Sequence, residues 1–256
     1  MKNNILASFI LTTVLAVPIH AQSQELDKLD LPDGFSIEIY AKVRNARQMS
    51  LGDDGTVYVG TRNRAGGRIF AIPDVDGDGK ADEVITIAKG LKTPSGLTFY
   101  KGNLYIGAIS RIYKISDITN TFRNNPEPEV LYGDLPNKTH HGWKFIEFGP
   151  DGLLYIPIGA PCNICEPDDE FSSINTLDVN NPDTGITQYA KGVRNTVGFD
   201  WDPVTGDLWF TDNGGDGLGD AMPADELNSA PKSGLPTIQP RKIKDMAPAA
   251  WETVKW

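Results

Sequence analysis

The chain has 256 residues, of which 39% are hydrophobic, 9% aromatic and 23% charged, so it can bury a core and is neither disordered nor collagen-like. Its formal net charge is −10, from 24 basic and 34 acidic residues. Because such a surface repels a phosphate backbone, the sequence argues against nucleic-acid binding.

The first 21 residues are expected to form a secretory signal peptide. Lys2 precedes an apolar run over residues 5–17, and Ala21 offers a small residue for cleavage. The run is too short to cross a bilayer. We therefore expect a mature chain that begins at Gln22, has no transmembrane segment, and is exported to the periplasm or secreted. An N-terminal membrane anchor is the alternative.

A repeated pattern of strand, Asp/Gly-rich turn and strand follows. It occurs over residues 49–60, 96–107, 144–159 and 197–212. Such turns between alternating apolar runs are strong hairpin signals. The second strand of each repeat carries an aromatic residue about 50 residues from the next one, a period typical of propeller blades. These aromatic residues are Tyr58, Tyr105, Tyr155 and Trp209.

Further strands are predicted after three of the hairpins, at residues 68–72, 111–115 and 174–179, and a fourth strand at residues 83–88 and 129–132. Four strands in each unit of about 50 residues indicate a β-propeller. We therefore expect an all-β chain in which residues 22–228 form about four blades of an incomplete propeller. A β-sandwich could use similar hairpins but would not need the repeated aromatic residue.

The repeat stops after residue 228. Residues 229–256 contain several prolines and lack both alternating strands and hairpin turns, which predicts an atypical C-terminal tail. The fourth blade then looks unfinished, as in a truncated or frame-shifted version of a longer protein. Its apolar side chains are expected to form an exposed face that favours self-association. These side chains are Phe199, Trp201, Leu208 and Phe210.

Four aspartates, Asp74, Asp76, Asp78 and Asp82, lie close together in a glycine-containing segment. Their spacing matches positions 1, 3, 5 and 9 of an EF-hand calcium loop, although Ile85 stands where an EF-hand has its glutamate. Three carboxylates within five residues repel one another unless a cation or water screens them. The segment therefore predicts a calcium site, with a solvated acidic turn as the alternative.

The only two cysteines are Cys162 and Cys165. In an oxidising compartment, a Cys-Asn-Ile-Cys segment is expected to close into a local disulfide. Haem attachment would need a histidine where Glu166 stands, and a zinc site would need two further ligands at matching spacing. We therefore predict a loop closed by a disulfide.

Propeller geometry places the start of a blade's first strand beside the end of its second strand, at one rim. It brings residues 139–141 beside 159–160, residues 194–195 beside 212–215, and Gln48 beside residues 61–63. Histidine, arginine, asparagine and a glycine-rich turn thereby gather around the central channel. The sequence predicts a pocket for a polar or anionic ligand there.

Several segments carry a family resemblance. His140-His-Gly-Trp-Lys144 and the residues after it, Lys191-Gly-Val-Arg-Asn-Thr-Val-Gly198, and Asp212-Asn-Gly-Gly-Asp216 followed by Asp225-Glu-Leu-Asn228 occur in this order. They resemble the histidine motif, the Gly-x-Arg-Asn-x-x-Gly motif, and the calcium-binding turn and acidic tail of the soluble quinoprotein glucose/sorbosone dehydrogenases. Gly159-Ala-Pro-Cys-Asn-Ile-Cys165 is similar to the sorbosone branch in particular. The resemblance covers residues 32–235.

This resemblance implies a six-bladed propeller that binds pyrroloquinoline quinone (PQQ) and calcium. The implied activity is oxidation of a sugar or a sugar aldehyde, with an electron acceptor that remains unknown. His140 matches the general base, and the usual histidine pKa of about 6.5 suits that role. His141 is offset from the motif by one residue, and a histidine pair with no catalytic role is the alternative.

The resemblance also implies the cofactor contacts. Arg194 and Asn195 match residues that contact PQQ, and a guanidinium can hold a PQQ carboxylate through two hydrogen bonds. A structural pairing of Arg194 with Asp212 or Asp225 is the alternative. Gly214 and Gly215 match the turn whose backbone carbonyls bind the cofactor's calcium.

Two departures from the family pattern weaken this expectation. Ala160 stands where the glucose-oxidising relatives have the aspartate that orients the histidine. The family's later blades, with further lysine and arginine contacts to the quinone, have no counterpart here, so we expect weak or absent PQQ binding and negligible activity. Two other functions stay open: a lactonase-type hydrolase with carboxylates and asparagines around a central metal, and a non-catalytic propeller fragment.

Overall fold

The computed structural model describes residues 26, 28–63, 66–219 and 224–231. The chain divides into two units, residues 1–40 and residues 41–256. In the described part of the first unit the apolar side chains Phe35, Ile37 and Ile39 are exposed. The predicted signal peptide, and the tail from residue 232 onward, lie outside the described residues.

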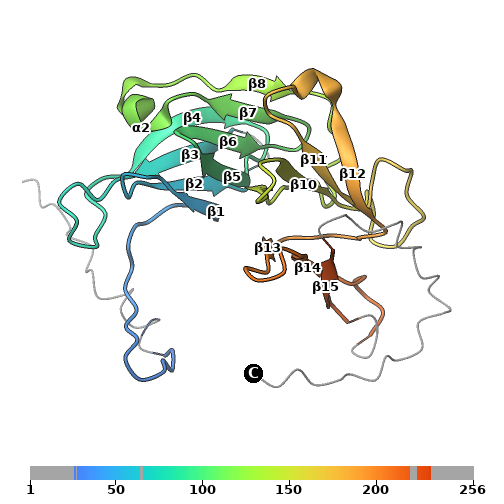
Figure 1. Ribbon diagram of the computed structural model, residues 1–256. Coiled ribbons are helices and arrows are strands. Elements are labelled where there is room, and N and C mark those ends of the chain that lie inside the picture. The colour runs from blue at the N-terminus through green and yellow to red at the C-terminus, as the bar shows by residue number, and fades with distance from the viewer. Residues whose placement is uncertain (1–25, 27, 64–65, 220–223, 232–256) are drawn as a thin grey trace, which may run out of the picture. The chain divides into compact units, whose positions relative to one another are not determined.

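The second unit contains four antiparallel sheets that follow one another in chain order (Figure 1). The first sheet is β1 (Ala46–Leu51), β2 (Val57–Thr61), β3 (Gly67–Ile72) and β4 (Ile85–Leu91). The second is β5 (Gly96–Tyr100), β6 (Asn103–Gly107), β7 (Ile112–Ile115) and β8 (Glu129–Tyr132). The third is β9 (Glu147–Phe148), β10 (Leu154–Ile158), β11 (Ser173–Leu177) and β12 (Ile186–Lys191). The fourth is β13 (Phe199–Trp201), β14 (Leu208–Asp212) and β15 (Glu226–Ala230).

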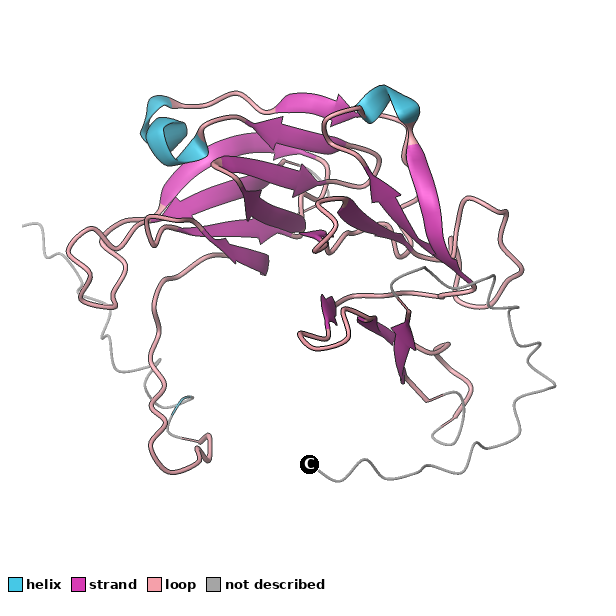
Figure 2. Cartoon of the chain, viewed as in Figure 1, coloured by secondary structure: helices cyan, strands magenta, loops and turns pink. Residues whose placement is uncertain are grey.

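Strands and connecting loops make up nearly all of the described chain (Figure 2). The short helices are α2 (Ile118–Thr121), η1 (Phe122–Asn124) and η2 (Pro182–Thr184). No helix among the described residues has the length and apolar character needed to cross a membrane. Each sheet pairs its strands in sequence order, as a propeller blade does. The prediction of an all-β propeller with four blades is confirmed.

The hairpin between β5 and β6 shows how the sequence sets the register of a blade. Tyr100 pairs with Asn103, which leaves Lys101 and Gly102 as a two-residue turn. Both have positive φ, 49° and 77°, as a type I′ turn requires. Glycine adopts this conformation at no steric penalty, so the Lys-Gly-Asn sequence fixes the turn and hence which side chains face each side of the sheet.

The repeated aromatic residue packs against the first strand of the following blade. The three tyrosines at this position are at most 4% exposed. The pairs are Tyr58–Phe99, Tyr105–Phe148 and Tyr155–Trp201, with ring centroids 6.0, 4.8 and 5.0 Å apart. Such pairs contribute roughly 0.5–1.5 kcal/mol beyond the burial of their area. The aromatic residue recurs about every 50 residues because each blade uses it to contact the next blade.

The apolar side chains of the fourth blade do not form the exposed face that the sequence predicts. Phe199, Leu208 and Phe210 are at most 8% exposed and pack against Tyr155 and Ile174 of the third blade. Alternate residues of a strand point to opposite faces. The apolar residues do share one face, as predicted. That face packs against the third blade and is buried, so the expectation of an exposed apolar face is wrong.

The strand β15 was not among the predicted strands. It pairs with β14 from Leu208–Ala230 to Asp212–Glu226, so it includes part of the segment that resembles the acidic tail. The sequence Glu-Leu-Asn-Ser-Ala has only two apolar residues and gives little strand signal. The register with β14 shows that pairing with a buried neighbour decides its conformation.

Gln48 joins the first strands of three blades. Its Oε1 accepts hydrogen bonds from the backbone N–H of Leu97, at 3.1 Å, and of Ile146, at 3.0 Å. Its Nε2 donates to the carbonyl oxygen of Ile146 at 2.7 Å. Since these strands belong to three different sheets, no regular ladder can satisfy their backbone groups, and the amide side chain does so instead.

Further side-chain contacts connect neighbouring first strands with the same offset of 49 residues. The Ser95 hydroxyl donates to the Lys144 carbonyl at 3.1 Å and accepts from the Lys144 N–H at 2.9 Å. The Thr98 hydroxyl donates to the Glu147 carboxylate. Burial raises the pKa of Glu147, and the hydrogen bond from Thr98 opposes that rise. The first strands are thus held in register by polar contacts as well as by the apolar core.

Lys144 is buried between the second and third blades, with 4% of its surface exposed. Its ammonium donates to the carbonyl oxygen of Gly142 at 2.8 Å. Burial lowers the pKa of Lys144 to about 8, because the charged form loses its hydration.

We predict that Gln48→Met lowers the free energy of unfolding by about 2–4 kcal/mol, because three backbone groups lose their partner while the side-chain volume is kept. Thermal unfolding followed by circular dichroism measures the effect. Gln188→Met, on the exposed side of β12, is the matched control and should change the midpoint little. Equal shifts for the two variants would show that the Gln48 contacts do not stabilise the fold.

We predict that Lys144→Met stabilises the chain most below pH 8. Because the pKa of Lys144 is lower in the folded chain, the unfolded chain binds more protons between pH 8 and 10.5, and the stability that this residue contributes rises with pH across that window. The difference in free energy of unfolding between Lys144→Met and the unmodified chain should therefore decrease by about 3 kcal/mol between pH 7 and pH 10.5. Urea unfolding at both pH values tests this, with exposed Lys89→Met as control; a pH-independent difference contradicts it.

Candidate functional site

A cavity of about 340 Å³ lies where loops of the first, third and fourth blades meet. Its lining comes from the loop after β2, the segment before β9, the loop between β12 and β13, and the segment after β14. The lining residues are Arg62, Thr139, His140, His141, Trp143, Arg194, Asn195, Asn213, Gly214, Asp216 and Asp225.

The predicted gathering of polar residues at one rim is present. Nδ1 of His141 lies 2.9 Å from the carbonyl oxygen of Ala160, so residues 139–141 do lie beside residues 159–160. The N–H of Asn213 donates to the carbonyl of Asn195 at 3.2 Å, which brings residues 194–195 beside the turn after β14. These contacts join segments that are 18 or more residues apart in the sequence.

The two histidines differ in how firmly they are held. His141 is partly buried and has a left-handed backbone, with φ of 47°. Because a carbonyl only accepts hydrogen bonds, its contact with Ala160 assigns the proton to Nδ1 of His141 and leaves the lone pair on Nε2. His140 is exposed and lies edge-on to the His141 ring, with centroids 4.1 Å apart.

The surroundings of His141 favour its neutral form. Burial lowers its pKa, the Arg194 guanidinium lowers it further, and the hydrogen bond to Ala160 opposes both. A neutral imidazole with a lone pair on Nε2 is the form that accepts a proton.

The backbone beside His141 leaves no room for a side chain at residue 159. A Cβ on Gly159 would lie 2.6 Å from the Cβ of His141, so glycine is required there.

Arg194 is anchored by two segments of the chain. Its Nε donates to the carbonyl of Asn163 at 3.1 Å and its Nη2 to the Asn163 side-chain oxygen at 2.8 Å. Its Nη1 donates to the carbonyl of Asn213 at 2.8 Å. Three of the five guanidinium N–H groups are therefore engaged within the described chain. The guanidinium is held by neutral oxygens and not by the aspartate that the sequence suggested as a structural partner.

Asp212 holds the backbone of the same segment. Its carboxylate accepts hydrogen bonds from the N–H of Arg194, at 2.9 Å, and of Asn195, at 2.6 Å. Burial raises the pKa of Asp212 to about 6, although both hydrogen bonds act in the opposite direction. Asn195 itself is 5% exposed. The segment that carries Arg194 is thus fixed through its main chain as well as its side chain.

The turn after β14 contains the two predicted calcium ligands. Gly214 lines the cavity, and its N–H donates to the carboxylate of Asp225 at 2.8 Å. Gly215 follows it against the loop of residues 162–165, where the predicted disulfide between Cys162 and Cys165 is present. Asp216 and Asp225 add carboxylates to the cavity.

The acidic segment lies between β3 and β4, apart from the residues that line the cavity. The carboxylate oxygens of Asp74, Asp76 and Asp78 lie within 4.8 Å of one another, close enough to bind one ion. Asp82 is not in this group, and its carboxylate accepts a hydrogen bond from the N–H of Val75 at 2.6 Å. The structure therefore brings three of the four predicted ligands together.

Sequence reasoning gave no role to Trp143 and Arg62. The Arg62 guanidinium lies over the Trp143 ring, 4.1 Å from its centroid, and both residues line the cavity. Such a contact is worth roughly 0.5–2 kcal/mol. The position of Trp143 within the histidine motif indicated that it lies near the site. Its contact with Arg62 could not be predicted, because Arg62 belongs to another blade, about 80 residues away.

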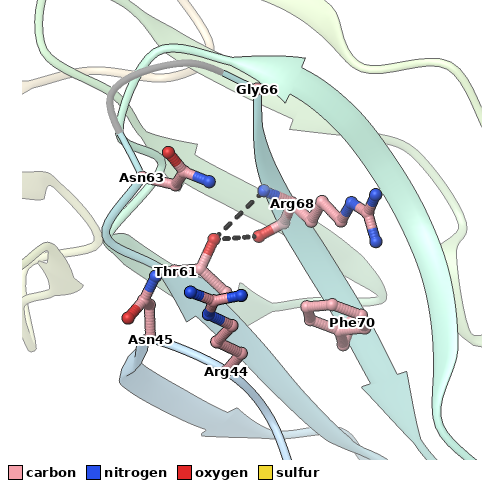
Figure 3. A pocket seen from close by; sticks show the side chains of 7 residues that line it. All are labelled: Arg44, Asn45, Thr61, Asn63, Gly66, Arg68 and Phe70. Atoms are coloured by element: carbon pink, nitrogen blue, oxygen red, sulfur yellow. Dashed lines mark hydrogen bonds between the residues drawn. The ribbon is translucent and has the colours of Figure 1, made fainter.

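A second cavity, of about 490 Å³, lies on the first blade (Figure 3). There the Thr61 hydroxyl donates to the carbonyl of Arg68 at 2.8 Å and accepts from its N–H at 3.0 Å, which ties β2 to β3. The cavity is lined by Arg44, Asn45, Thr61, Asn63, Gly66, Arg68 and Phe70. Because none of the predicted catalytic or cofactor-binding residues lines it, the function is argued from the first cavity.

Solved structures with a similar fold include three sugar-related enzymes. A Trichoderma reesei enzyme of carbohydrate-active family AA12 is 18% identical, with a TM-score of 0.65 over 80% of this chain and 58% of that chain. The holo PQQ domain of pyranose dehydrogenase from Coprinopsis cinerea is 14% identical, with a TM-score of 0.58 over 74% and 51%. The PQQ-bound aldose sugar dehydrogenase from Streptomyces coelicolor is 19% identical, with a TM-score of 0.52 over 73% and 60%. At these identities the likeness shows the fold.

Two comparisons rest on the sequence. An uncharacterized protein of Borreliella burgdorferi is 28% identical over 244 residues, which are 89% of this chain and 62% of that protein. The chain therefore spans less than two thirds of the length of this relative. A family model described as a domain of unknown function, DUF7133, matches residues 21–254. Since that match covers most of the sequence, the chain belongs to the DUF7133 family.

Proposed function

We propose that this chain carries the site of a PQQ-dependent dehydrogenase of sugars or sugar aldehydes. The observation that carries the proposal is the cavity that gathers His140, His141, Arg194, Asn195 and the turn at residues 213–216. These residues come from the motifs that resemble the quinoprotein dehydrogenases, and the third and fourth blades must assemble to bring them together. The fold shared with PQQ-binding structures gives independent support.

The residues of the cavity fit an anionic, planar cofactor. Arg194 keeps two N–H groups beyond the three bonded within the described chain, which is enough for a carboxylate. Arg62 adds a second positive charge, and Trp143 adds an aromatic surface. PQQ, when bound, supplies the hydride acceptor.

Calcium at the carbonyls of Gly214 and Gly215 belongs to the same proposal. Asp216 and Asp225 place two carboxylates beside the guanidinium that would hold the cofactor. A cation bound at the turn offsets their charge, and backbone carbonyls are ligands that calcium accepts. The acidic group Asp74, Asp76 and Asp78 is proposed as a separate calcium site that stabilises the loop between β3 and β4.

The histidine pair supplies the base that takes a proton from the substrate hydroxyl. The motif assigns this role to His140. In the glucose-oxidising relatives an aspartate orients the histidine. Here the main-chain carbonyl of Ala160 binds Nδ1 of His141 and orients that ring instead. Ala160 is therefore compatible with an oriented base at this position, and paired variants decide which histidine acts.

The finer assignment to sorbosone-type substrates rests on the segment at residues 159–165. We also propose export, since a disulfide is typical of periplasmic and secreted proteins. A lactonase-type hydrolase finds less support. The cavity does hold two carboxylates and two asparagines, Asp216, Asp225, Asn195 and Asn213, but its histidine pair and Arg194 fit a hydrolase of this type less well.

The first test is PQQ binding and turnover by the purified chain. Titration of PQQ in the presence of calcium, followed by absorbance, measures binding, and an artificial electron acceptor with a panel of sugars and sugar aldehydes measures turnover. We expect His140→Ala to reduce kcat/KM by about 10²–10⁴-fold, because a general base contributes that much, while PQQ affinity stays near that of the unmodified chain.

His141→Ala is the matched variant. If it carries the loss of activity while His140→Ala remains active, the base is His141 and the motif is shifted by one residue. Near-normal activity in both variants contradicts a histidine base. Lactone hydrolysis with calcium alone, and no PQQ binding, would replace the proposal with a hydrolase.

The acidic loop gives a separate prediction. Millimolar calcium should raise the melting temperature by a few degrees, because it binds the folded loop in preference to the unfolded one. Asp76→Ala should remove most of that increase, whereas Asp53→Ala, at an exposed aspartate outside the loop, should keep it. An unchanged increase in Asp76→Ala assigns the stabilising calcium to another site, such as the turn at Gly214 and Gly215.

A further inference from the structure

The loop closed by the disulfide lies against the turn after β14. Asn163, between the two cysteines, makes contacts with two segments that line the cavity. Its carbonyl and its Oδ1 accept hydrogen bonds from Nε and Nη2 of Arg194. Its Oδ1 also accepts from the N–H of Asp216 at 2.8 Å, and its Nδ2 donates to the Asp216 carbonyl at 2.8 Å.

These contacts determine how the guanidinium is turned. Two of its three hydrogen bonds within the described chain end on Asn163, and both lie along the edge formed by Nε and Nη2. The third ends on the Asn213 carbonyl in the turn itself. Because a guanidinium is planar, fixing one edge fixes the direction in which the remaining N–H groups donate.

The disulfide limits the movement of Asn163. A bond between Cys162 and Cys165 closes a loop of four residues and removes much of its conformational freedom. The adjacent Ile164 packs on the turn, since a Cβ at Gly215 would lie 3.5 Å from its Cγ1. The loop thus meets the turn through two hydrogen bonds between Asn163 and Asp216 and through the apolar contact of Ile164.

We propose that Asn163, held by the loop of residues 162–165, is a positioning residue that orients the Arg194 guanidinium and the turn at Gly214–Asp216 toward a carboxylate ligand in the cavity. The identity of that ligand as PQQ rests on the proposed function. The orientation of Arg194 does not, and it can be measured without a cofactor.

An asparagine suits this position because its amide both accepts and donates. Oδ1 serves Arg194 and Asp216 together, while Nδ2 returns a hydrogen bond to Asp216. Asn163→Asp keeps the acceptor for Arg194 and loses the donor. Asn163→Ala loses both side-chain groups and keeps only the main-chain carbonyl that accepts from Nε, so the two variants separate the orientation of Arg194 from the attachment of the turn.

The cofactor-free experiment measures hydrogen exchange of the Arg194 Nη2–H, which donates to the Asn163 side chain, by NMR, with the signal assigned through its loss in Arg194→Lys. We expect exchange to become roughly tenfold faster in Asn163→Ala and in the double variant Cys162→Ser/Cys165→Ser, as loss of one hydrogen bond implies. Asn163→Asp should stay near the unmodified chain. Glu166→Gln, at an exposed residue next to the loop, is the control and should change nothing.

The second experiment measures PQQ affinity in a double-mutant cycle. Asn163→Ala should weaken binding roughly tenfold in the unmodified chain and leave it unchanged in the Arg194→Ala background, because the side chain through which it acts is then absent. Equal weakening in both backgrounds would show a general structural role and overturn the proposal. Thermal unfolding of each variant confirms that the comparison is made between folded chains.

The two experiments distinguish the two claims. Unchanged exchange of the Arg194 Nη2–H in Asn163→Ala overturns the positioning role, whatever the affinity for PQQ. Faster exchange in that variant, together with no PQQ binding by the unmodified chain, supports the positioning role and rejects PQQ as the ligand.

Discussion

The amide of Gln48 satisfies backbone groups that no β-ladder can reach. It lies on the first strand of the first blade and bonds to residues just within or before the first strands of the next two blades. The third blade's first strand begins just after the histidines that line the cavity. The Gln48 contacts therefore help to hold the first blade, which carries Arg62, beside the segment that carries these histidines.

Buried polar groups also fix the main chain and the side chains of the candidate site. Asp212 fixes the main chain of residues 194 and 195, and the Ala160 carbonyl fixes the ring of His141. Each of these polar partners is buried or partly buried, so each bond is formed where water competes little. A ligand that enters the cavity meets groups whose directions are already set, and binding loses less conformational entropy than it would with mobile loops.

The features that the sequence predicts correctly depend on residues close together in the chain or on a repeated pattern. Two-residue turns, alternating apolar positions and a repeated aromatic residue revealed the hairpins and the propeller, because each depends on neighbours in the chain. Gln48, Asn163 and Asp212 had no such signal, since their partners lie between 17 and 98 residues away. Alternation also leaves open which face of a strand meets which blade, and for Phe210 that choice was made wrongly.

The constant offset of 49 residues between bonded first strands has an evolutionary consequence. Because the second blade carries such contacts toward both the first and the third blade, a duplicated unit like it would bring its own interfaces with it. Outer strands and surface loops can then change length without disturbing the channel. A single-residue insertion within an inner strand would instead exchange its inward and outward side chains and break these contacts, so such a chain is extended with least disturbance by whole blades.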